Sequence, residues 1–184
     1  MPLTVIATPG ATNANSFVTV AEADAYVDAQ MERTGWPVAA DDKARALFAA
    51  TADISALTFV GSRTATEQAL AWPRSQAPNP DARNDNGWPN NIPSWDIVYF
   101  DDAVIPQRVK DATCELAYRY AVNGAPNTGV IPSSQNVIEK TVDVLTTKFS
   151  DPSQRVIGMG LYPRVAQWLR PLLQAGASLI VSRQ

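Results

Sequence analysis

The sequence contains no histidine and a single cysteine among its 184 residues. Without histidine the chain lacks Ser-His-Asp and Cys-His machinery, imidazole metal ligands and imidazole acid–base chemistry. The lone cysteine, Cys114, excludes an internal disulfide and a multi-cysteine metal site. We therefore predict that the protein is not an enzyme and that it binds no metal and no cofactor.

Charge is also scarce, because only 18% of the residues are Asp, Glu, Lys or Arg and the formal net charge is −3. This charge balance argues against a protein whose whole surface binds nucleic acid or acidic lipid, although it does not exclude a local basic patch. No apolar run approaches the roughly 18 residues of a membrane span. Residues 1–10 lack the basic start of a signal peptide. We expect a soluble protein made in a cytoplasm, with no membrane partner.

Hydrophobic residues make up 46% of the chain, enough for a real core, and the length favours one domain with appendages. Thr19 and Glu22 form a capping box that opens a helix ending at Gly35. A second helix begins at Asp41 or Asp42 and ends near residues 59–61. The apolar stripes of these two helices are Val20, Ala23, Val27 and Met31, then Leu47, Ala50, Ile54 and Leu57.

Three further helices are predicted downstream. Thr64 and Glu67 suggest a second capping box and a short helix to about Leu70, closed by residues 71–74. The strongest helix runs from Pro106 to about Val122, and a last one covers residues 162–170 before Pro171. In the 106–122 helix the apolar face is Val109, Ala112, Leu116, Ala117 and Tyr120, and the polar face is Arg108, Asp111, Glu115 and Arg119.

The remaining segments read as appendages. Residues 1–18 form an N-terminal arm, and residues 177–184 form a C-terminal arm. Between them, residues 19–176 form a helical domain with an irregular Asn/Pro-rich insertion at about 78–100, in which residues 97–100 favour a short strand. β-branched residues predict a β appendage at about 136–150. The fold class is thus mainly α: a small helical bundle with a β-strand or hairpin appendage and extended terminal arms.

The motifs that could indicate catalysis or ligand binding are better explained by structural roles. Cys114 lies near an apolar helix edge, which is typical of a small buried thiol. Residues 81–87 resemble a calcium loop, but Arg83 occupies a ligand position, so a solvated turn is favoured. Residues 158–160 (Gly-Met-Gly) lack a third glycine and read as a turn. Three Trp-Pro pairs predict core anchors, with base stacking as the alternative: Trp36-Pro37, Trp72-Pro73 and Trp88-Pro89.

The apolar end of the chain is the candidate binding site. Leu179, Ile180 and Val181 can pack on their own domain or add to a partner's sheet through main-chain hydrogen bonds. A disordered end remains the alternative. We predict that these three residues bind a partner.

Four segments, residues 14–26, 68–74, 105–112 and 162–173, resemble a phage family of small head–tail connector (adaptor) proteins, many of which are labelled DnaT-like single-stranded-DNA-binding proteins. In order, these segments span nearly the whole chain. The insertion at about 78–100 departs from the family pattern, in which this turn is often shorter.

The resemblance implies a virion structural protein that functions in head completion at the capsid–tail junction. Its copies would form a ring, a dodecamer by this resemblance, between the portal protein and a stopper or tail-completion protein. Genomic DNA would pass through the channel during ejection without sequence-specific binding. The alternative is a single-stranded-DNA-binding replication protein, which the acidic balance and the lack of interleaved basic and aromatic residues disfavour.

Overall fold

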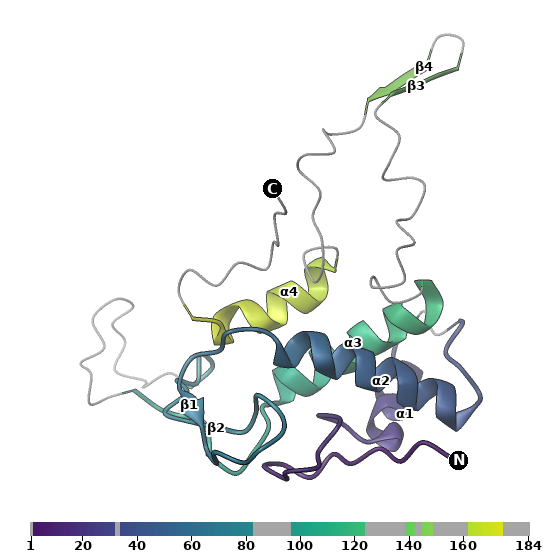
Figure 1. Ribbon diagram of the computed structural model, residues 1–184. Helices are drawn as coiled ribbons and strands as arrows, with labels where there is room; N and C mark the ends of the chain where they lie inside the picture. The colour runs from purple at the N-terminus through teal and green to yellow at the C-terminus, as the bar shows by residue number, and fades with distance from the viewer. Residues whose placement is uncertain are drawn as a thin grey trace.

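The structure, a computed structural model that describes residues 2–31, 34–82, 97–123, 139–142, 145–148 and 162–174, is built around four helices (Figure 1). The helices are α1 (Val20–Asp28), α2 (Ala40–Ser55), α3 (Gln107–Asn123) and α4 (Pro163–Leu169), which a 3₁₀ turn, η6 (Arg170–Leu172), follows. Two antiparallel pairs complete the fold: β1 (Ser62–Arg63) with β2 (Arg74–Ser75), and β3 (Glu139–Val142) with β4 (Leu145–Lys148). The predicted helical bundle with a hairpin appendage is confirmed.

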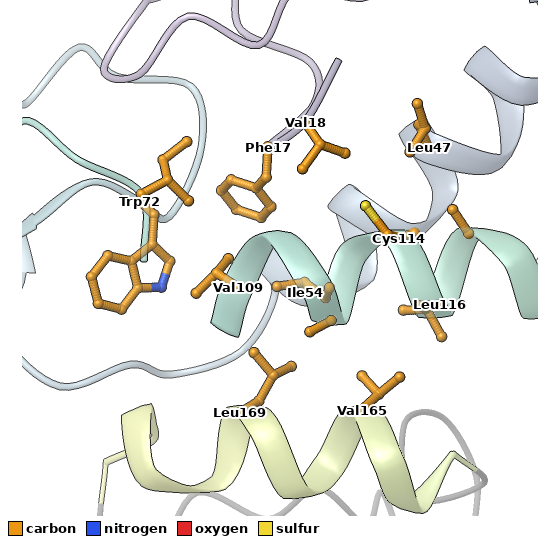
Figure 2. Close-up of a cluster of buried hydrophobic side chains, with 14 of the residues drawn as sticks. Phe17, Val18, Leu47, Ile54, Trp72, Val109, Cys114, Leu116, Val165 and Leu169 are labelled. Atoms are coloured by element: carbon orange, nitrogen blue, oxygen red, sulfur yellow. The ribbon is translucent and has the colours of Figure 1, made fainter. Parts of the chain in front are cut away.

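Helix α3 is the centre of the bundle and contacts α1, α2 and α4. Figure 2 shows α3 between two groups of side chains: Phe17, Val18 and Leu47 lie on one side, and Val165 and Leu169 of α4 lie on the other. The side chains of Phe17, Val165 and Leu169 are each at most 1% exposed. The segment before α1 therefore ends inside the core, where it closes the bundle over α3.

The predicted apolar face of α3 is confirmed, because Val109, Ala112, Leu116, Ala117 and Tyr120 are all buried. The predicted polar face is wrong at Glu115, which is only 3% exposed. Neighbouring helices cover α3 on more than one side, so a carboxylate that a simple amphipathic helix would expose is buried here. The predicted Glu115–Arg119 pair is confirmed at 3.0 Å.

Helix α1 begins at the predicted capping box. The Thr19 hydroxyl accepts from the Glu22 backbone N–H at 3.2 Å, and the Glu22 carboxylate accepts from the Thr19 N–H at 2.7 Å. The helix ends at Asp28, earlier than predicted, because the chain folds back and Trp36 donates to Asp24. Met31, predicted to lie in the apolar stripe, is consequently outside the helix and fully exposed.

The predicted short helix at residues 64–70 is wrong, because β1 and β2 pair across a turn there. The Thr64 hydroxyl does not cap a helix but donates to the carbonyl oxygen of Asp102. Inside the turn, the buried Gln68 side chain accepts from the Ala65 N–H and donates to the carbonyl oxygens of Leu70 and Pro73. This side-chain network satisfies the backbone groups that a helix would have paired.

Helix α4 lies close to its expected bounds and gives way to η6 at Pro171. Helix α2 begins near the predicted residues but ends at Ser55, before the predicted end near residues 59–61. The predicted strand at 97–100 is wrong, because these residues form only an isolated β-bridge between Pro78 and Tyr99, in which the Asn79 N–H donates to the Val98 carbonyl oxygen and the Phe100 N–H donates to that of Ala77. Most of the insertion, residues 83–96, lies outside the described residues.

Substituting Thr19→Ala should destabilise the protein by about 1 kcal/mol, because the backbone N–H of Glu22 loses its acceptor at the start of α1. Thr19→Ser keeps the hydroxyl and is the matched control, which should unfold near the wild-type urea concentration. Urea unfolding followed by circular dichroism measures both. Equal midpoints for the Ala and Ser variants would mean that the cap contributes nothing.

Candidate functional site

The residues predicted to bind a partner, Leu179, Ile180 and Val181, lie outside the described residues, which end at Gln174. Leu173 forms a β-bridge with Phe59, and the Gln174 N–H donates to the Thr58 carbonyl oxygen at 3.0 Å. The Val60 N–H donates to the carbonyl oxygen of Leu172 at 3.0 Å. These bonds place residues 172–174 beside the loop that leads into β1.

Arg74, in one of the four segments that carry the family resemblance, is a structural residue. Its guanidinium donates to four backbone carbonyl oxygens: Phe59 at 3.2 Å, Val60 at 2.7 Å, Gly61 at 2.5 Å and Ala71 at 3.2 Å. Burial, with a contribution from the Arg63 charge, lowers its pKa from the ordinary value. The guanidinium donors are used inside the fold, so Arg74 is poorly placed to bind a phosphate.

Gly61 explains how the backbone reaches this arginine. Its φ of +73° lies in the left-handed region that favours glycine, and a Cβ there would overlap the carbonyl oxygen of Ser75. A side chain at this position would push the 59–61 loop away from β2. Glycine therefore permits the close approach that Arg74 bridges.

The predicted core-anchor role is confirmed for Trp72, which is 1% exposed. Its ring packs edge-on against Phe59 and Phe100, with centroids 5.6 Å and 6.0 Å away. Trp36 is half-buried, donates to Asp24 at 2.7 Å and lies beneath the Lys43 ammonium. The buried Trp72 ring offers no face for stacking on a base, and Trp88 lies outside the described residues.

Most lysine and arginine side chains of the described bundle are paired with the protein's own carboxylates. The pairs are Lys43–Asp24 at 2.7 Å, Arg45–Asp42 at 2.5 Å, Lys110–Glu22 at 2.7 Å, Arg119–Glu115 at 3.0 Å and Arg108–Asp81. A DNA phosphate at any of these cations would have to compete with an adjacent carboxylate. The described helices therefore present no continuous basic track.

Glu115 is the most connected of these carboxylates. It accepts from the Tyr26 hydroxyl at 3.1 Å and from Arg119 at 3.0 Å, and Arg164 lies 3.7 Å away. Burial, and then the Glu115 charge, raise the pKa of Tyr26, which keeps its proton in this contact. The cluster joins α1, α3 and α4. The sequence contains the Glu115–Arg119 spacing but gives no signal that Glu115 is buried or that Arg164 approaches it.

A groove of about 350 Å³ lies between α1 and α3. It is lined by Val18, Glu22, Ala25, Tyr26, Gln107, Lys110, Asp111 and Cys114. Burial, with Asp111 and Glu22 nearby, raises the pKa of Cys114 to about 12, so the thiol is protonated at neutral pH. The predicted buried, unreactive thiol is confirmed in its burial, since Cys114 is 3% exposed.

Strands β3 and β4 form the predicted appendage. Their register places Glu139 opposite Lys148, Lys140 opposite Thr147, Thr141 opposite Thr146 and Val142 opposite Leu145. Figure 1 shows this hairpin away from the four helices, and among the described elements each of its strands packs extensively only on the other. Both outer edges of the hairpin are therefore open within the described structure.

The described residues contain no group of three or more Cys, Asp or Glu side chains that could hold a metal ion. In the same residues, no helix has the length and apolar character needed to cross a membrane.

The structure is thus that of a small helical-bundle protein with a β-hairpin appendage. Most basic side chains of its described bundle form ion pairs within the chain. The chain belongs to the family described as "Putative DnaT-like ssDNA binding protein", which matches residues 1–184. No curated protein and no solved structure matches the chain. The family match supports the DNA-binding label that came with the sequence resemblance, and it gives no support to the head–tail connector assignment.

Substituting Arg74→Lys should destabilise the protein by about 1–2 kcal/mol, because an ammonium cannot reach all four carbonyl oxygens and part-buried acceptors lose their donor. Arg45→Lys is the matched control, because Arg45 is exposed and pairs only with Asp42 on the surface. Urea unfolding measures both. If the two variants unfold alike, the structural role of Arg74 is wrong.

Proposed function

We propose that this protein is a virion assembly protein: a head–tail adaptor whose copies form a ring between the portal and a stopper or tail-completion protein. The observation that carries this proposal is the β3–β4 hairpin, whose outer edges are covered by no other described element. A two-stranded hairpin is at best marginally stable alone in water, so it gains most from a partner. The four segments that resemble connector proteins supply the rest of the argument.

The charge arrangement agrees with this proposal. Cations on α2 and α3 are paired with carboxylates of the same chain, two of which lie on α1, and the formal net charge is −3. A ring with an acidic balance would let DNA slide through its channel, because phosphates would be repelled rather than held. Its place would be the capsid–tail junction, after synthesis in the host cytoplasm.

Deletion of residues 177–184 should leave a folded protein that attaches weakly to the portal of the same phage, because the apolar segment Leu179–Val181 is lost. Deletion of residues 182–184 alone keeps this segment and is the matched control. Co-expression with the portal, followed by size-exclusion chromatography, measures attachment, and circular dichroism checks folding. Portal attachment that is equal for both deletions would count against the arm, and no attachment by the wild type would count against the adaptor proposal.

The second candidate is a single-stranded-DNA-binding protein, and the family description backs this candidate more than it backs the adaptor. Against it stand the paired cations of the described bundle and the burial of the Trp72 ring. Such a site usually combines a basic groove with exposed aromatic side chains.

Fluorescence anisotropy with a labelled oligothymidine separates the two candidates. A single-stranded-DNA-binding protein should bind at sub-micromolar concentration and lose affinity steeply as salt is raised, because bound phosphates release counterions. The adaptor should show no binding in that range at physiological salt. A duplex of the same length is the control. Tight, salt-dependent binding of the single strand alone would replace the first proposal by the second.

A further inference from the structure

We infer that the β3–β4 hairpin binds the same hairpin of a second copy, strand edge to strand edge. This inference rests on the proposed ring assembly and names the contact that would hold neighbouring copies together. Strand β4 of one copy would lie antiparallel to β3 of the next. Because every copy contributes the same pair of strands, repetition of this contact produces a continuous antiparallel sheet that can close on itself.

The backbone supplies the first argument. In an antiparallel pair, alternate residues direct their N–H and C=O groups toward the partner strand, and the residues between them direct these groups outward. Each outer edge of the β3–β4 hairpin therefore carries unpaired donors and acceptors, and no other described element packs extensively on it. Open edges of this kind pair with another strand unless they are blocked. Neither strand contains proline, which would block an edge by removing an N–H.

The register of the strands supplies the second argument. It favours the hairpin of a second copy as the partner that pairs with the open edge. Within one hairpin Glu139 lies opposite Lys148. If the next copy pairs without a shift, its Glu139 lies opposite Lys148 of the first copy as well. Each Lys148 is then flanked by two glutamates and each Glu139 by two lysines. Opposite charges on directly facing residues stabilise a pair of strands, and like charges destabilise it.

Residue preference supplies the third argument. The inner positions of the hairpin are Lys140, Thr141, Val142, Leu145, Thr146 and Thr147, so one of the six is charged and faces a threonine. Threonine and valine are favoured in strands, and pairs of threonines contribute across neighbouring strands. In the unshifted register, Thr146 of one copy lies opposite Thr141 of the next, so the same pairs recur within and between copies.

A charge-swap mixture tests the contact in the full-length chain. Glu139→Lys leaves lysine at both register positions, and Lys148→Glu leaves glutamate at both. Each variant alone should associate about fivefold more weakly per contact than the wild type, because like charges face each other between copies. An equimolar mixture of the two variants should recover association, because every contact between unlike copies then joins opposite charges. Sedimentation velocity over a range of protein concentrations measures this.

The mixture separates contacts between copies from stability within one hairpin. In the mixture each hairpin still has like charges across its own two strands, so recovery can come only from pairing between copies. The double variant Glu139→Lys/Lys148→Glu restores both pairings and should associate like the wild type. Absence of recovery in the mixture, with recovery in the double variant, would overturn the inference and leave the charge pair as an internal feature of the hairpin.

Two further results distinguish this inference from the proposed function. If the wild type assembles and both single variants assemble equally well, the hairpin contact is wrong while the ring proposal survives. If the wild type stays monomeric at every concentration, both are wrong. Binding of oligothymidine that Lys148→Glu abolishes, without recovery in the mixture, would assign the hairpin to DNA and also overturn the inference.

Discussion

Burial of α3 on several sides is the constraint on which the rest of the structure depends. Four of its buried residues carry a polar group: Thr113, Glu115, Tyr118 and Tyr120. Buried polar groups are costly unless they are hydrogen-bonded. Each of these four has a partner: the hydroxyl groups donate to Val109, Thr34 and Asp53, and Glu115 accepts from Tyr26 and Arg119. The contacts that satisfy α3 are the ones that position α1, α2 and the segment after α1.

The burial of α3 also determines how the charged side chains around it are paired. Arg119 and Arg164 approach the carboxylate of Glu115, and Lys110 of α3 pairs with Glu22 of the α1 capping box. Hydrogen bonds from Lys110 and Thr19 outweigh the effect of burial, and together they lower the pKa of Glu22. The cations around α3 therefore join helices to one another. A partner that binds these cations would have to break contacts that hold the bundle together. The appendages are therefore the better candidates for binding a partner.

The sequence predicted those parts of the fold that depend on local patterns. The capping box of Thr19 and Glu22, the apolar stripe of α3 and the hairpin near 136–150 all follow from spacing and residue preference, and all three are found. The prediction failed where a distant residue decides. Thr64 and Glu67 have the spacing of a capping box, yet Asp102, 38 residues away, takes the Thr64 hydroxyl. Arg74 likewise organises a loop more than ten residues upstream, which no local pattern indicates.

The bundle and the hairpin differ in how many of their groups remain available for binding a partner. The buried polar side chains of α3 are hydrogen-bonded within the bundle, and most basic side chains of the described bundle are paired with carboxylates of the same chain. The hairpin has no comparable support from its own bundle, because β3 and β4 pack extensively only on each other among the described elements. A free hairpin of four-residue strands orders many backbone torsions in return for few hydrogen bonds. Pairing both of its edges adds main-chain hydrogen bonds to strands that are already ordered, so the larger gain in stability comes from association rather than from folding of the single chain.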